Sequence, residues 1–325
     1  MENCVTALVT PFANGAVDGG KWDSLVHFQL ENGVRKVVAN GTTGESPTTS
    51  DAEKAGLVRR AVAAGGEVTA GCGSNDTSHT GHLIEAAASE GVGRALLVDC
   101  YYNGPSSLEL REEHYGYLCS SFPEMKFTAY VIPGRTGCEL SVEDLAHLHS
   151  GNPNLDCVKE ATGNLERMRR TRELSPSIRI MSGDDDLTYR MMADGGIGAS
   201  GVISVASNIA PRAVNEMCVA ANAGDGRASD LAAKLAPLFS LVTVKAGGHK
   251  FRNPVPFKTA MAGLGMIDYG VRRPLGRMSA EGTRHVRSTL AQLWRDSPEI
   301  LEPVGKFFDV DIDARLESDS HWISY

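Results

Sequence analysis

A lysine at the end of a short apolar run could act as a nucleophile. The run Asp156-Cys157-Val158-Lys159-Glu160 reads as a β-strand, with Lys159 near its C-terminal end. An ammonium group among apolar side chains is poorly solvated, so it gives up its proton easily, and the neutral amine can attack a carbonyl carbon to form a Schiff base. The plain alternative is a lysine whose stem packs at the strand end while its ammonium reaches solvent.

Hydroxyl groups that could move protons follow other predicted strands. They are Thr42 and Thr43, Tyr101 and Tyr102, and Tyr130. A tyrosine at a strand end often only packs, with its hydroxyl hydrogen-bonded. Several hydroxyls at one rim can instead pass a proton between a bound imine and solvent, which carbanion chemistry at a Schiff base requires.

Three further segments bear on binding. Gly41–Ser46 brackets its threonines with glycines, which lets backbone N–H groups approach a carboxylate, and it leads into a helix capped by a Ser50/Glu53 capping box. Arg135 has a planar donor fork that suits a carboxylate, with a surface ion pair as the alternative. The run Asp184–Asp186 could suggest a divalent metal, but no histidine or further carboxylate motif accompanies it, so we expect a solvated loop and helix cap and no metal.

Strand and helix patterns alternate along the first two thirds of the chain. Eight β-prone runs fall at 5–9, 36–39, 67–71, 94–98, 126–131, 156–160, 179–182 and 198–202. Amphipathic helical stretches between them include 24–32, 51–64, 77–89, 141–149 and 165–174. This order predicts an α/β fold, a (β/α)₈ TIM barrel. An open nucleotide-binding sheet is the weaker alternative, because no Gly-x-Gly-x-x-Gly follows the first strand.

A helical extension is expected after the eighth strand. We divide the chain into a barrel core at 1–210 and C-terminal helices at 211–325 that complete and flank the barrel. The predicted helices are 211–221, 228–245, 256–264 and 280–295. The charged stretch from about residue 298 has no assigned role.

Composition narrows the class of function. The net charge of −8 disfavours nucleic acid as a partner, although His249-Lys250-Phe251-Arg252 is a local basic run. The apolar stretches are shorter than the roughly 20 residues of a membrane span, and the N-terminus lacks a signal-like segment, so we expect a cytoplasmic protein. Seven cysteines without a Cys-x-x-Cys pair argue against a disulfide framework and a zinc site. A small-molecule substrate is the expectation.

Together, the motifs resemble the dihydrodipicolinate synthase and N-acetylneuraminate lyase family of Schiff-base enzymes. The matching segments follow one another along most of the chain: Thr6–Phe12, Gly41–Ser46, Tyr101–Asn103, Pro133–Gly137, Lys159–Gly163, Ser182–Asp185, Gly201–Ser204 and Asn253–Lys258. The doubled threonine and Gly134-Arg135-Thr136-Gly137 are most similar to the 4-hydroxy-tetrahydrodipicolinate synthase branch, which condenses pyruvate with aspartate 4-semialdehyde.

The resemblance implies a role for each candidate residue. Lys159 forms the imine with pyruvate and no other cofactor is needed, and binding residues at the pyruvate carboxylate include Thr43 and the backbone of Ile203, with Gly183 beside them. Arg135 binds the carboxylate of the semialdehyde. The proton relay is Tyr130, Thr42 and Tyr102. Tyr102 is expected to reach into a neighbouring subunit of a homotetramer, a dimer of dimers.

Two groups of residues depart from the family pattern. Asp99-Cys100 and Val131 replace the usual residues near the catalytic tyrosines, which we interpret as changes behind the site. The groove that binds lysine in feedback-inhibited relatives corresponds to Ser46, Lys54, Asn75, His79 and Tyr101. Because Lys54 and His79 stand where those relatives have a histidine and a glutamate, we expect lysine to inhibit weakly or not at all.

Two rival functions use the same residues. Another class I aldolase on this barrel, acting on a 2-keto-3-deoxy sugar acid, N-acetylneuraminate or 4-hydroxy-2-oxoglutarate, would also need Lys159 and Tyr130, so the second carbonyl substrate decides; Arg135 favours a small acidic aldehyde. A catalytically silent paralogue that binds a keto acid is the rival from a different class, and the full set of catalytic residue types argues against it.

Overall fold

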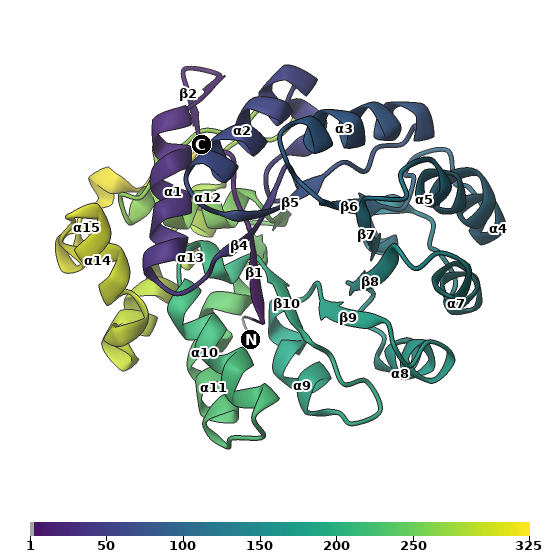
Figure 1. Cartoon of the computed structure of the whole chain (residues 1–325). Coiled ribbons are helices and arrows are strands. Elements are labelled where there is room, and N and C mark those ends of the chain that lie inside the picture. The colour runs from purple at the N-terminus through teal and green to yellow at the C-terminus, as the bar shows by residue number, and fades with distance from the viewer. Residues whose placement is uncertain (1–2) are drawn as a thin grey trace.

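A closed barrel of eight parallel strands forms the centre of the molecule (Figure 1). The computed structural model describes residues 3–325, so the first two residues of the expected barrel core lie outside the described residues. The strands follow one another around the barrel in chain order, with β10 closing onto β1. They are β1 (Cys4–Ala7), β4 (Lys36–Ala39), β5 (Glu67–Gly71), β6 (Arg94–Val98), β7 (Lys126–Val131), β8 (Leu155–Glu160), β9 (Arg179–Ser182) and β10 (Gly201–Ser204). The predicted TIM barrel is confirmed.

Helices surround the barrel and connect successive strands. The main connections are α1 (Gly19–Glu31), α2 (Asp51–Ala63), α3 (Thr77–Ser89), α4 (Ser107–Glu109), η2 (Leu110–Gly116), α5 (Tyr117–Ser121), α7 (Val142–Gly151), α8 (Leu165–Leu174), α9 (Thr188–Ala193) and α10 (Pro211–Asn222). The expected capping box of α2 is present, since Ser50 and Glu53 each bind the other's backbone. α1 begins earlier than expected because Asp18, and not Ser24, caps it.

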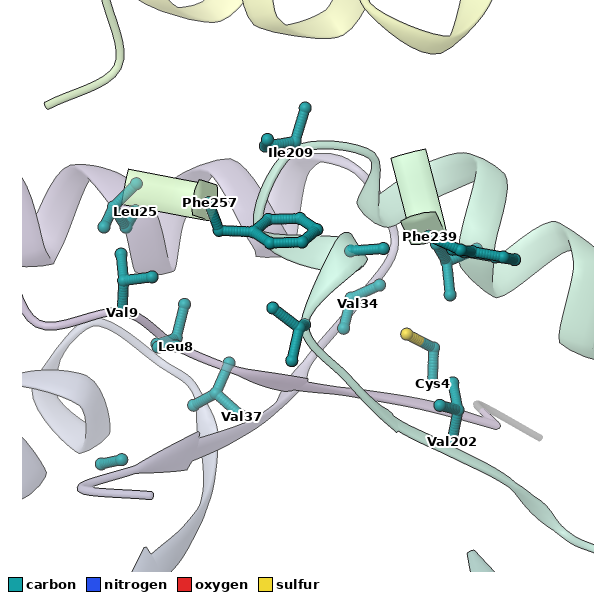
Figure 2. Packing of buried hydrophobic residues seen from close by; sticks show 14 of the residues in the cluster. Cys4, Leu8, Val9, Leu25, Val34, Val37, Val202, Ile209, Phe239 and Phe257 are labelled. Atoms are coloured by element: carbon teal, nitrogen blue, oxygen red, sulfur yellow. The ribbon is translucent and has the colours of Figure 1, made fainter. Parts of the chain in front are cut away.

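Apolar side chains fill two separate regions. Inside the barrel lies a small cluster that includes Tyr130, Met181 and Ile203. A larger core lies between the barrel wall and the helices. Figure 2 shows Val37 and Val202 from the strands packed with Phe239 and Phe257 from the C-terminal helices. Each such fully buried side chain contributes about 1.5–3 kcal/mol, so the helices hold the barrel wall, and with it the strand ends, in one arrangement.

A β-hairpin interrupts the C-terminal helices, which corrects the predicted helix at 228–245. α11 (Arg227–Ser240) ends early, and β11 (Thr243–Ala246) pairs antiparallel with β12 (His249–Arg252). The physical reason is the Gly247-Gly248 pair, which has φ values of +57° and +77° and makes the two-residue turn that joins such strands. The basic run noted in the sequence is therefore β12, a largely exposed strand that contacts the loop after β7 through Arg252 and Gly134.

The remaining C-terminal elements pack against the barrel helices. They are α12 (Val255–Gly263), α13 (Ala280–Asp296), η5 (Pro298–Ile300), α14 (Glu302–Phe308), α15 (Ile312–Glu317) and η6 (Asp319–His321). α14, yellow in Figure 1, lies beside α1, and α15 packs against α13. The Phe28 ring of α1 is 5.3 Å from the Phe307 ring and 5.2 Å from the Phe308 ring. Part of the stretch from residue 298, which had no assigned role, therefore covers Phe28 of α1.

Shorter elements complete the description. They are β2 (Phe12–Ala13), β3 (Ala16–Val17), η1 (Ser46–Thr48), α6 (Pro133–Thr136), η3 (Asp185–Leu187) and η4 (Ala206–Asn208). The division at residue 210 falls between β10 and α10, the helix that completes the last β/α unit. No helix within residues 3–325 has both the length and the apolar character that a membrane crossing requires.

Candidate active site

Lys159 and Tyr130 lie side by side inside the barrel. They are register partners on the adjacent strands β8 and β7, and the lysine Nζ is 4.2 Å from the centre of the tyrosine ring. Each side chain is only 5% exposed. Alternate residues of both strands point into the barrel, which explains why this pair shares one face. The amine is therefore held in a sparsely hydrated space beside a phenol, as Schiff-base chemistry requires.

Gly183 makes room for the Lys159 side chain. A Cβ atom added at Gly183 would lie 3.1 Å from the lysine Cε and 2.6 Å from the Ala161 Cβ. Any larger residue would press on the lysine stem. Ile203, the other expected binding residue of this wall, lies on β10 in the same interior cluster as Tyr130 and is 4% exposed.

A cavity of about 230 Å³ opens at the strand ends above this pair. Its lining includes Thr42, Ser46, Tyr101, Tyr130 and Arg135. Four different β/α loops or strand ends contribute these residues, which is the usual construction of a site on a TIM barrel. Lys159 does not itself line this cavity, but its neighbour Tyr130 does. Three of the residues predicted to do chemistry or bind substrate thus share one space.

Asn253 connects the residues expected to bind carboxylates. Its Nδ2 donates to the Thr43 Oγ1 at 2.9 Å, and its backbone carbonyl accepts a hydrogen bond from the Arg135 Nη2 at 3.0 Å. Asn253 was not predicted as a site residue, although it stands in one of the family segments. Its contacts fix Thr43, which is 3% exposed, and hold one terminal nitrogen of the Arg135 guanidinium.

A buried ion pair anchors the turn that carries Thr42 and Thr43. Glu45 adopts a left-handed backbone conformation with φ of +57°, and its Oε1 lies 2.5 Å from the Lys258 Nζ. The other carboxylate oxygen accepts the backbone N–H of Arg272 at 2.9 Å. Burial lowers the pKa of Lys258 to about 8 despite this partner. Neither residue was predicted to support the site, because 213 positions separate them in the sequence.

Tyr102 does not reach the cavity of its own chain. Its side chain is 89% exposed and its φ is +82°, a conformation that few residues other than glycine adopt. The adjacent Tyr101 lines the cavity instead. Backbone strain of this kind persists only where the surrounding structure imposes it, and here it turns the phenol outward.

The residues of the expected lysine groove do not line one common hollow. Ser46 and Tyr101 line the active-site cavity, and Asn75 is exposed. Lys54 and His79 meet at Asp51: the Lys54 Nζ lies 3.6 Å and the His79 Nε2 3.0 Å from its carboxylate. The hydrogen bond from His79 lowers the pKa of Asp51. Asp51 is a carboxylate outside the expected groove residues, and Lys54 and His79 both already contact it.

Two buried carboxylates lie behind Lys159 and Tyr130. The backbone N–H of Asp99 donates to the Tyr130 carbonyl at 3.2 Å, and its carboxylate accepts from the Tyr115 hydroxyl at 2.7 Å. Burial raises the pKa of Asp99 to about 7. Glu160, adjacent to Lys159, pairs with Arg167 at 3.3 Å. The departure at Asp99 therefore places a titratable group directly behind Tyr130.

The acidic run after β9 differs from expectation. Asp185 is not solvated: it is 3% exposed and accepts hydrogen bonds from the Ser204 hydroxyl and from the N–H groups of Val205 and Ala206. Its side chain does not cap η3, the helix that it begins, because these partners on the β10 loop take its oxygens. Only Asp186 is exposed. Within the described residues, no group of His, Cys, Asp or Glu is arranged to hold a metal ion.

Comparisons with known proteins identify the family of this chain. The model of the dihydrodipicolinate synthetase family matches residues 1–293. The 4-hydroxy-tetrahydrodipicolinate synthase of Trichlorobacter lovleyi is 42% identical over 285 residues, or 86% of this chain and 94% of that protein.

Solved structures extend the likeness to the fold. The 4-hydroxy-tetrahydrodipicolinate synthase of Methylacidiphilum fumariolicum SolV superposes with a TM-score of 0.85 at 34% identity, covering 94% of this chain and 99% of that one. The chloride-inhibited dihydrodipicolinate synthase of Acinetobacter baumannii, complexed with pyruvate, gives a TM-score of 0.83 at 33% identity, covering 90% and 98%. On sequence and fold, this chain belongs to the dihydrodipicolinate synthetase family.

Proposed function

We propose that the protein is a lyase that condenses pyruvate with aspartate 4-semialdehyde to give 4-hydroxy-tetrahydrodipicolinate, a step of lysine and diaminopimelate biosynthesis. The observation that carries the proposal is the pairing of Lys159 with Tyr130 below a cavity lined by Thr42 and Arg135. The relative from Acinetobacter baumannii that is complexed with pyruvate has the same fold. Curated relatives with 4-hydroxy-tetrahydrodipicolinate synthase activity in their names support the second substrate.

The first half of the reaction uses the barrel interior. The neutral amine of Lys159 attacks the pyruvate carbonyl carbon, and loss of water leaves an imine. The cationic imine withdraws electrons, so the methyl group loses a proton and an enamine forms. Tyr130 and Thr42 are the groups of this chain that carry protons to and from the imine. Thr43, held by Asn253, and the backbone at Ile203 receive the pyruvate carboxylate.

The second half joins the two substrates. The enamine carbon attacks the aldehyde carbon of aspartate 4-semialdehyde, whose carboxylate is bound by Arg135. The α-amine of the bound aldehyde then attacks the imine carbon, which closes the ring and releases Lys159. No resident cofactor is part of this sequence, because the covalent imine on Lys159 is the electron sink.

The test mixes the purified protein with both substrates and follows NADPH oxidation through added dihydrodipicolinate reductase. Lys159→Ala should abolish turnover and borohydride trapping of pyruvate, while Lys126→Ala, at an exposed lysine that begins β7, should leave both unchanged. Trapping without turnover would move the assignment to another aldolase of the same barrel. Pyruvate binding that survives in Lys159→Ala without turnover in the wild type would point to the keto-acid-binding paralogue.

The proposed assembly is a homotetramer built from dimers in the cytoplasm. The exposed, outward Tyr102 supports this proposal, because its phenol can join the proton relay only in a neighbouring subunit. Light scattering at assay concentration, together with the turnover of Tyr102→Phe, tests it. A monomer with full turnover would refute it.

We further propose that lysine inhibits this enzyme weakly or not at all. Lys54 and His79 both engage Asp51, so an incoming ammonium meets one cation and a carboxylate that is already paired. Titration of lysine into the coupled assay tests the proposal, and half-inhibition at sub-millimolar lysine would contradict it.

A further inference from the structure

A second hollow adjoins the active-site cavity, and we call it the hairpin cleft. Its volume is about 570 Å³, and it shares Thr42, Pro47 and Arg135 with the active-site cavity. The opposite wall is the end of the β11–β12 hairpin, with Lys250 and Arg252. The two hollows therefore meet at the residues expected to face the aldehyde substrate, and the hairpin forms part of the approach to them.

Arg135 and Arg252 each donate a hydrogen bond to a backbone carbonyl next to the other residue. The Arg135 Nη2 donates to the carbonyl of Asn253, the residue after Arg252, at 3.0 Å. The Arg252 Nη1 donates to the carbonyl of Gly134, the residue before Arg135, at 3.2 Å. This crossed arrangement fixes two guanidinium groups next to one another, although like charges repel.

Neither guanidinium has a carboxylate partner among residues 3–325. No ion pair involves Arg135 or Arg252, and Glu45, the acidic side chain in the cleft lining, is engaged by Lys258 and by the backbone of Arg272. Burial lowers the pKa of Arg135, and the charge of Arg252 acts in the same direction. A guanidinium has five N–H donors, so each arginine retains donors for a ligand after its one backbone contact.

We propose that Arg252 is a specificity-determining residue that binds the carboxylate of the aldehyde substrate together with Arg135. A carboxylate between the two groups offsets their mutual repulsion and accepts charge-assisted hydrogen bonds from both. The inference rests on the proposed condensation, since it names the group that recognises the second substrate. The β11–β12 hairpin would then help to bind the aldehyde and would not affect the binding of pyruvate.

The test compares Michaelis constants for the two substrates. Arg252→Ala should raise the KM for aspartate 4-semialdehyde about tenfold, which corresponds to about 1.4 kcal/mol, and leave the KM for pyruvate unchanged. Arg252→Lys, which keeps the charge without the fork, should give an intermediate value. Arg190→Ala, at an exposed arginine on α9 outside the cleft, is the matched control and should match the wild type.

Arg252→Gln separates the charge from the backbone contact, because the amide can still donate to the Gly134 carbonyl. A wild-type KM for the aldehyde in this variant, or equal effects on both substrates in Arg252→Ala, would overturn the proposal. Borohydride trapping of pyruvate on Lys159 is measured in every variant. Trapping that persists while the aldehyde KM rises supports the role of Arg252, whereas a wild type that traps pyruvate but does not turn over with the semialdehyde would contradict the proposed function itself.

Discussion

Replacing Lys258 with methionine should destabilise the protein strongly, because it leaves a buried carboxylate without its cation. The side chains of Lys258 and Glu45 are 0% and 1% exposed. Removing one partner of such a pair costs about 3–5 kcal/mol. With an unfolding entropy of about 2.1 cal/mol/K per residue, a chain of 325 residues loses about 4–7 °C in Tm.

Thermal unfolding followed by circular dichroism at pH 6.5, below the pKa of about 8 of Lys258, measures this loss. Lys234→Met is the matched control, since its ion pair with Glu299 is about half exposed on both sides and should contribute less than about 1 kcal/mol. Adding Glu45→Gln should recover part of the stability, because no buried charge then remains.

Two results would refute the reasoning about this pair. One is a Tm for Lys258→Met within about 1 °C of the wild type, which would mean that water or another group reaches Glu45 easily. The other is a double variant that is less stable than Lys258→Met alone, which would mean that Glu45 stabilises the turn without its charge partner.

Two other predictions concern the catalytic wall. Gly183→Ala should abolish borohydride trapping of pyruvate on Lys159 while the protein still folds, because the added methyl group presses on the lysine stem and Ala161; trapping at the wild-type rate would contradict the steric argument. Burial raises the pKa of Asp99 to about 7 from 3.8. Between these two pH values the folded state holds a proton that the unfolded state lacks. The resulting contribution to stability is complete below about pH 4 and is lost as the pH rises through about 7. Denaturant unfolding of wild type and Asp99→Asn at pH 5 and pH 8 checks it: the wild type should lose more stability than the variant over this interval, and parallel losses would contradict the assignment.

Local pattern was enough to predict the barrel and the rim of its site. Each strand is a short apolar run, and Thr42, Tyr130 and Lys159 each stand at or just after the end of one, so parallel packing brings them to one end of the barrel. The eighth strand lies at Gly201–Ser204 and not at 198–202, because Gly198 has a left-handed backbone with φ of +55° that is not part of a strand.

The supporting contacts could not be predicted in the same way. Asp185 was expected in solvent because its partner Ser204 lies on another strand, and no local pattern indicates that contact. The predicted helix at 228–245 extended over most of β11, because the periodic apolar residues of α11 continue to Val244 before the glycine turn. Pairs such as Glu45 with Lys258 depend on how distant segments meet, which only the folded chain determines.

The helix α14 lies outside the part of the chain that matches the family model, yet it covers an aromatic side chain of the barrel helix α1. The family match ends at residue 293, before α14 begins at Glu302. Phe28 is fully buried in the whole chain, and Phe307 and Phe308 are the rings that cover it. A chain shortened to the family boundary would leave this aromatic surface of α1 in water and prone to self-association. Expression designs guided by the homologous span alone would therefore produce a less soluble molecule than designs that retain the final helices.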